Sequence, residues 1–181
     1  MATKQAQEAE KDDRLRSSSP HFRAMTINEV ELRVGTDNKD MDFTQLFLYA
    51  DARVFMDILD QTVGPLGWQR LHPTAHTCVL SIYDGIFGQW VSKQDFGGGI
   101  GNADDKSASS DAFKRACVVF GIGRELYSCP KIFVKHRDLP EDKKGNASIN
   151  GVKITKFVVE NQKIKELEIE ANNKKIYEFK A

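Results

Sequence analysis

One strongly patterned helix constrains this fold more than any other part of the sequence. It spans residues 102–124, and its start is polar, with Asn102 as a candidate N-cap and acidic residues placed to suit the helix dipole. Gly121 and Gly123 supply the left-handed backbone freedom that ends a helix. Between these ends, apolar residues recur at steps of three and four: Ala112, Phe113, Ala116, Cys117 and Phe120. We therefore predict a helix that packs one side against a core.

The other side of this helix is polar and carries two adjacent cations, Lys114 and Arg115. Lys106 stands at the border near the helix start. A solvated helix surface and an anion-binding surface both fit these residues. Lys114 and Arg115 alone do not decide between these two interpretations.

Three short extended segments precede the helix, at residues 68–72, 77–83 and 90–96. The dipeptide Asp84-Gly85 marks a tight turn between the last two. Three such strands predict an antiparallel meander, which is most readily stabilised by a helix packed on one face.

The N-terminal half carries two further patterns. Residues 29–34 alternate polar and apolar side chains, as a half-buried strand does, and residues 36–42 read as a polar turn. Residues 46–63 show helical spacing that ends at Gly64-Pro65.

Three more alternating segments close the sequence, at residues 152–159, 164–169 and 175–179, and predict a small β meander. The expected fold class is α+β, with a β-β-β-α core and this C-terminal extension. We expect the domain boundaries to be a flexible tail over 1–21, a core over 22–135, a loop over 136–150 and the extension over 151–181.

Composition is that of one globular domain, with 181 residues, 40% hydrophobic and 29% charged. There is no apolar run of about 20 residues and no secretory h-region, so we expect a cytoplasmic protein without a membrane partner. The cysteines, odd in number, favour a reducing compartment. The formal net charge is zero, so binding of a polyanion would require cations that are gathered on one part of the surface.

Two enzymatic interpretations fail on spacing. The glycines at 97–101 are followed by Lys106-Ser107, whereas a phosphate loop needs Gly-Lys-Ser/Thr contiguous. Asn102 replaces the last glycine of the dinucleotide fingerprint. His72, His76 and Cys78 lack the second pair of ligands that a zinc site needs. We expect no metal, no cofactor and no catalytic residues.

Basic residues interleaved with aromatics remain. Lys93 lies between Trp90 and Phe96, and other cations surround the helix. Lysine and arginine neutralise phosphates, and aromatic rings stack on bases. Arg53, in the earlier helical pattern, reads as a surface residue or as one that faces a ligand.

Four blocks of the chain, in order, resemble one family. They are residues 49–54 (YADARV) with Val63-Gly64 and Gly67-Trp68, residues 90–95 (WVSKQD), residues 110–116 (SDAFKRA) with Phe120-Gly121, and residues 121–127 (GIGRELY). The sequence is similar to the Rad52-like superfamily of single-strand annealing proteins, especially its short phage-type (Sak-like) members. The resemblance covers roughly residues 25–130.

This resemblance implies an ATP-independent annealing protein for recombination, not an enzyme, that assembles into rings or filaments and holds single-stranded DNA in a basic groove. By position, Arg53, Lys106, Lys114 and Arg115 would line the groove. Eukaryotic members carry a further arginine where this chain has Val118, and Arg124 or Lys93 are the candidates to compensate.

The sequence thus predicts a homo-oligomer that binds single-stranded DNA and pairs complementary strands, in the host cytoplasm if phage-encoded. A single-strand binding protein or an exonuclease is a candidate partner. Two alternatives stay open: an adaptor whose basic surface holds an acidic protein, and a nucleotide- or metal-dependent DNA-processing enzyme.

Overall fold

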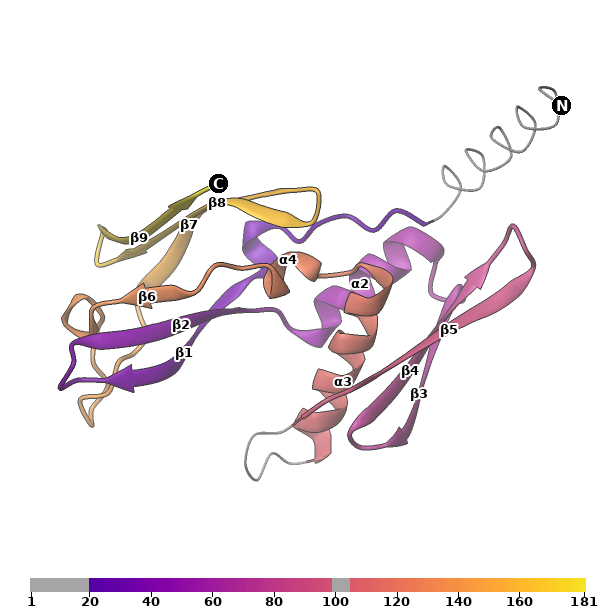
Figure 1. Cartoon of the computed structure of the whole chain (residues 1–181), viewed down its shortest axis with the longest axis horizontal. Helices are drawn as coiled ribbons and strands as arrows, with labels where there is room; N and C mark the ends of the chain where they lie inside the picture. The colour runs from indigo at the N-terminus through magenta and orange to yellow at the C-terminus, as the bar shows by residue number, and fades with distance from the viewer. Residues whose placement is uncertain (1–19, 99–104) are drawn as a thin grey trace, which may run out of the picture. The chain divides into compact units, whose positions relative to one another are not determined.

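The computed structural model of the chain describes residues 20–98 and 105–181 and divides into two compact units (Figure 1). Unit 1 contains residues 20–23 and Phe55–Ile122. Unit 2 contains Ala24–Val54 and Gly123–Ala181. The predicted α+β class is confirmed. The predicted domain boundaries stay a prediction, and most of the predicted tail lies outside the described residues.

Unit 1 is built on a three-stranded antiparallel sheet. Its strands are β3 (Trp68–Thr74), β4 (Thr77–Asp84) and β5 (Gln89–Phe96), in that spatial order. Leu80 in the central strand pairs with Arg70 on one side and with Lys93 on the other. The three strands predicted from alternation and turn residues are confirmed.

Helix α3 (Asp105–Phe120) packs on one face of this sheet. The buried side chains of Cys78, Leu80 and Ile82 alternate along β4 and form the sheet side of the core. The helix side is formed by Ala108, Ala112, Phe113, Ala116 and Cys117. The stripe predicted from helical spacing is therefore the buried one, although Phe120 is only half-buried.

Strand β5 and helix α3 approach each other most closely at Gly97. A Cβ atom at this position would lie 2.4 Å from both the Ala108 carbonyl oxygen and the Ala112 nitrogen. Glycine is thus required here for close backbone approach. Two further glycines of the 97–101 stretch, Gly99 and Gly101, lie outside the described residues.

Helix α3 ends at Phe120, directly before Gly121, one of the two glycines predicted to end it. Gly121 adopts φ 104°, and the Ile122 amide donates to the Cys117 carbonyl over 3.1 Å. The chain then forms a separate short helix, α4 (Arg124–Tyr127). The helix end predicted at the glycines is thus confirmed, and Arg124, the last residue of the predicted stretch, begins the next helix. The predicted N-cap Asn102 lies outside the described residues.

Helix α2 (Ala52–Val63) begins where Asp51 Oδ1 accepts the Arg53 amide proton over 2.9 Å. The helix predicted to start at residue 46 is wrong there. Leu46 instead belongs to strand β2 (Phe43–Tyr49) and pairs with Val34. Leu46 and Leu48 satisfy a helical spacing with the residues that follow and also an alternating one, and pairing with the neighbouring strands decides for the sheet.

Unit 2 contains two three-stranded antiparallel sheets. The first has the order β1 (Glu31–Asn38), β2, β6 (Ile132–Val134), so β1 extends into the predicted turn. The second is formed by β7 (Val152–Glu160), β8 (Lys163–Ala171) and β9 (Lys174–Lys180), which confirms the C-terminal meander. Two 3-10 turns, η1 (Ile27–Glu29) and η2 (His136–Asp138), complete the unit.

The two sheets of unit 2 share one core. Its buried members are Leu32, Leu46, Ile132, Val134, Leu139, Ile164, Leu167 and Ile169. The C-terminal meander therefore packs against strands from the beginning of the chain. Both of its hairpin turns place two consecutive non-glycine residues at positive φ, Asn161-Gln162 and Asn172-Asn173, as tight two-residue turns require.

A buried polar network ties the 136–147 segment to the first sheet of unit 2. Asp37 Oδ1 lies 2.7 Å from His136 Nδ1 and accepts a proton from Thr44 Oγ1 over 2.6 Å. Its Oδ2 accepts the Ala147 amide over 2.9 Å. Glu141 Oε1 lies 3.4 Å from His136 Nε2. The network joins two segments that are about 100 positions apart in the sequence, residues 37–44 and 136–147.

Across residues 20–98 and 105–181, we find no helix with the length and apolar character needed to cross a membrane.

Candidate nucleic-acid interface

Four of the six predicted site residues lie on helix α3 and strand β5 of unit 1. Lys106 is exposed in the first turn of α3, and Lys114 and Arg115 follow two turns later. The 16-residue helix is about 24 Å long, so these cations are distributed along it rather than clustered at one point. We refer to Lys93, Lys106, Lys114 and Arg115 together as the basic layer of unit 1.

Lys93 of β5 extends to the C-terminal end of α3. Its ammonium group donates to the Val119 carbonyl over 3.2 Å and lies 4.6 Å from the centre of the Phe120 ring. A cation is favoured at this end of a helix, because the last carbonyl groups carry partial negative charge. The strand therefore supplies a positive charge to the turn of α3 that contains Val118.

Arg115 lies beside an acidic residue of strand β5. The Arg115 guanidinium turns toward β5, where Nη2 lies 3.4 Å from Asp95 Oδ1. The Arg115 side chain is 42% exposed and the Asp95 side chain is 25% exposed. Arg115 Nε is buried and has no hydrogen-bond partner within the described part of the chain. The sequence placed Lys114 and Arg115 together on one polar side, and the structure directs Arg115 toward β5.

Sequence analysis missed a further cation, Arg70, on β3. Its guanidinium lies over the Phe113 ring, 4.7 Å from the ring centre, and the Trp68 ring stacks on the same phenylalanine at 5.9 Å. Arginine commonly stacks on aromatic faces in this way. The alternation of β3 was the available signal, because it places Trp68 and Arg70 on the same face.

Arg53 and Arg124 belong to unit 2. The Arg53 side chain is 85% exposed, and its Nε lies 3.2 Å from Asp51 Oδ1. Arg124 is exposed, and its Nη1 lies 3.5 Å from Gln162 Oε1. A role for either residue in binding DNA stays a prediction from the sequence.

The sheet face of unit 1 opposite α3 is uncharged. From the alternation and register of the strands, its paired residues are Gln69 and Leu71 on β3, Thr77, Val79, Ser81 and Tyr83 on β4, and Trp90, Ser92, Gln94 and Phe96 on β5. Leu71 is 65% exposed and Phe96 61%, and the Tyr83 and Trp90 rings meet edge to face at 5.4 Å. We call these ten residues the open face.

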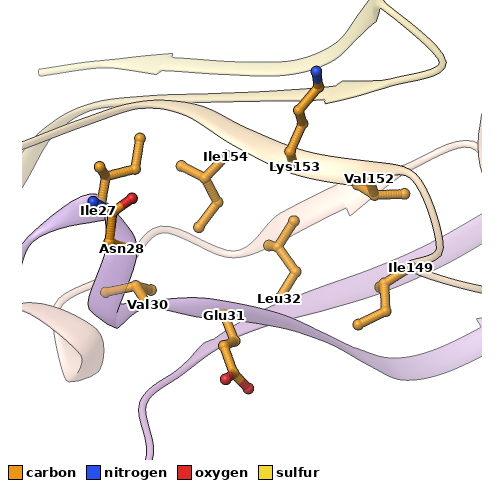
Figure 2. Close-up of a pocket in the computed structure, with 9 residues that line it drawn as sticks. All are labelled: Ile27, Asn28, Val30, Glu31, Leu32, Ile149, Val152, Lys153 and Ile154. Carbon is orange, nitrogen blue, oxygen red and sulfur yellow. The ribbon is translucent and has the colours of Figure 1, made fainter. Parts of the chain in front are cut away.

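Unit 2 has a cavity of about 420 Å³ beside strands β1 and β7. Leu32 and Ile154 are directed into the space between the strands, while the Lys153 ammonium and the Glu31 carboxylate are directed away from it (Figure 2). The lining is therefore mainly apolar side chains and backbone. It offers no group suited to bind a phosphate.

The histidines considered as metal ligands contact backbone carbonyl groups, and Cys78 is buried. His72 Nδ1 lies 3.0 Å from the Thr77 carbonyl oxygen, and His76 Nδ1 lies 3.2 Å from that of Gly97. Burial raises the pKa of Cys78 to about 11. A search of the described ranges finds no group of three or more potential metal ligands close together.

Comparison with known proteins identifies the family of the chain. The model of the Rad52/22 family of double-strand break repair proteins matches residues 22–144. This is more than half of the chain, which therefore belongs to that family.

One curated relative is the single-stranded DNA-binding protein DdrA of Deinococcus deserti, 34% identical over 114 residues. The match covers 60% of this chain and 55% of DdrA, so the chain spans about half the length of that relative. No solved structure matches the chain.

Proposed function

We propose that this protein binds single-stranded DNA through the basic layer of unit 1 and anneals complementary strands as a homo-oligomer, without nucleotide hydrolysis. The basic layer along α3 and β5 is the observation that carries the proposal. The family to which the chain belongs, and the relative that is a single-stranded DNA-binding protein, support it.

The basic layer suits a phosphate backbone because its charges follow the length of α3. Each lysine or arginine that neutralises a phosphate releases a counterion, so binding is strong and depends on salt. Base edges need no contact with the protein in this arrangement, which leaves them available to a complementary strand. Sequence preference is accordingly weak.

Lys93 supports continuity of the layer where the chain carries Val118. Its ammonium lies beside Val119 and Phe120, in the last turn of α3. A cation supplied by β5 thereby takes the place of the arginine that eukaryotic members carry on the helix. Arg124, the other candidate, lies beyond the end of α3 in unit 2.

The open face supports assembly. Charged residues are depleted from the cores of protein interfaces, and aromatic residues are enriched there. The open face has no charged member and exposes Leu71, Tyr83, Trp90 and Phe96. An oligomer would bring basic layers from several subunits together, so a chain with zero net charge can still present a continuous basic path.

The double variant Lys114→Ala, Arg115→Ala tests the proposal. We expect weaker binding of a fluorescent oligothymidylate in anisotropy titrations, with unchanged assembly in light scattering. The log–log salt slope should fall by about 0.7 for each phosphate that the protein no longer neutralises. Asp57→Ala on the exposed surface of α2 is the control for general surface change. Unchanged affinity in a correctly assembled double variant would refute the assignment of the layer.

A second measurement separates the proposal from its two alternatives. Annealing of complementary oligonucleotides should proceed at full rate in EDTA without ATP. A requirement for nucleotide or metal would indicate a processing enzyme. Binding that resists competition by oligothymidylate but yields to an acidic protein would indicate an adaptor.

A further inference from the structure

We propose that Asp95 is a positioning residue that holds Arg115 in the DNA-free protein and is displaced from it by a phosphate, so that Asp95 limits the affinity for single-stranded DNA. This inference rests on the proposed function. It assigns a role to an acidic residue within the basic layer.

The contact between the two side chains is single and long. Arg115 Nη2 lies 3.4 Å from Asp95 Oδ1, whereas an Arg–carboxylate pair of full strength is bidentate at about 2.7–2.9 Å. A guanidinium has five N–H donors, and here Asp95 engages one of its nitrogen atoms. A phosphate can offer two oxygens in parallel to the same group.

The Arg115 side chain is also incompletely satisfied in this position. Its Nε is buried without a hydrogen-bond partner among the residues the structure describes. A buried donor without an acceptor is unfavourable. The side chain is nevertheless 42% exposed, so its outer nitrogen atoms remain accessible. A phosphate that draws the guanidinium outward would relieve this deficit.

Asp95, in contrast, is fixed. Its Oδ1 accepts the Phe96 amide over 2.7 Å, which holds the carboxylate orientation. Two residues on, Gly97 lies against the α3 backbone, and its amide donates to the His76 carbonyl over 2.8 Å. The carboxylate is therefore held beside α3 by its backbone. Arg115 is the member of the pair that can move.

Asp95 therefore competes with a DNA phosphate for Arg115. The Asp95 carboxylate occupies the position of a counterion for Arg115, and its negative charge stays near any phosphate that binds there. Removing the charge should free Arg115 for DNA without changing the number of cations. Asp95→Asn makes this change with nearly the same shape.

We expect Asp95→Asn to bind a fluorescent oligothymidylate roughly two- to fivefold more tightly at 50 mM salt, the range of a partly exposed ion pair. The salt slope should steepen by up to about 0.7, because one more phosphate is neutralised at full strength. Asp57→Asn makes the same charge change on the exposed surface of α2 and should have little effect.

The Arg115→Ala background provides the decisive comparison. Asp95→Asn should have no effect on affinity there, because its action requires Arg115. A gain of the same size in Arg115→Ala or in Asp57→Asn would overturn the inference, as would weaker binding by Asp95→Asn itself. If Asp95→Asn lacks the native circular dichroism spectrum, Asp95→Ser replaces it and keeps an oxygen near the Phe96 amide.

Failure of this inference and failure of the proposed function are distinguishable. If the unmodified protein binds no oligothymidylate, the proposed function fails. If the unmodified protein binds and the two asparagine variants behave alike, the inference alone fails.

Discussion

The outer faces of two three-stranded sheets in this protein are opposite in character. The open face of β3, β4 and β5 has no charged residue among its paired positions. On β7, β8 and β9, lysines and glutamates pair across the strands, with Lys156 Nζ 2.6 Å from Glu166 Oε2 and Lys175 Nζ 3.1 Å from Glu168 Oε2. Both are antiparallel meanders of similar length, so the difference lies in the side chains.

This comparison indicates what each surface can do. The lysines paired on the C-terminal sheet have glutamate partners, so they add little attraction for a polyanion. An uncharged surface with exposed rings is costly to leave in water and suits a protein partner. The net charge of the chain therefore says little about its attraction for a polyanion, because ion pairing decides which cations are available to bind one.

The largest expected effect comes from placing a charge on the open face. If subunits assemble through the open face as proposed above, Phe96→Glu should disrupt the oligomer, because the interface core would then bury an unpaired carboxylate. Multi-angle light scattering should show a smaller species. Thr155→Glu, on the exposed surface of β7, is the matched control and should leave the mass unchanged. An unaltered mass for Phe96→Glu would show that the open face does not form the subunit contact.

The second-largest expected effect is on the stability of unit 1. Gly97→Ala should lower the free energy of unfolding by about 1–3 kcal/mol, because its Cβ would overlap the backbone of α3. Gly98→Ala is the control, since a Cβ there meets no atom within 4 Å. Both tryptophans lie in unit 1, so urea titrations followed by tryptophan fluorescence report on it directly. Equal stability of the two variants would contradict the close approach.

The smallest effect is a pH dependence confined to unit 2. The hydrogen bond to Asp37 raises the pKa of His136, although burial opposes this. Burial alone would raise the pKa of Asp37, but hydrogen bonds from Thr44, Ala147 and His136 outweigh it and lower the pKa to about 2.

The signs of the two contributions follow from these directions. The His136 contribution is complete below its unfolded pKa of about 6.5 and is lost as pH rises through the higher folded value. The Asp37 contribution is complete above about pH 4 and is lost as pH falls toward about 2. His136→Gln should therefore flatten the alkaline decline of unfolding free energy measured by circular dichroism between pH 5 and 9. His76→Gln in unit 1 should retain that decline.

Much of the fold was predictable because local patterns and local turns agree. Seven strands, β1, β3, β4, β5, β7, β8 and β9, followed from alternation and turn residues, and the core stripe of α3 followed from its spacing. The strand at Leu46 was mistaken for helix, since a few apolar residues satisfy both periods. Strand β6 is only three residues long and left no pattern. The common core of the first and last sheets depends on packing between residues more than 100 positions apart.

The candidate site was predictable in composition but not in geometry. Resemblance and residue type identified Lys114 and Arg115 as candidates. The orientation of Arg115 toward Asp95 depends on the register of β5 and on the close approach at Gly97, which no local pattern encodes. The position of Lys93 at the end of α3 has the same origin.

The three cysteines make the protein a convenient subject for chemical labelling. Burial raises the pKa of Cys78 and Cys129 to about 11, and it also raises the pKa of Cys117 well above its ordinary value. At pH 7, four pH units below 11, roughly one such thiol in ten thousand is a thiolate, the reactive form. A cysteine introduced at exposed Ser92 would therefore react with a maleimide dye far faster than the native thiols. Whether a partner subunit shields this position from the dye would test the proposed role of the open face.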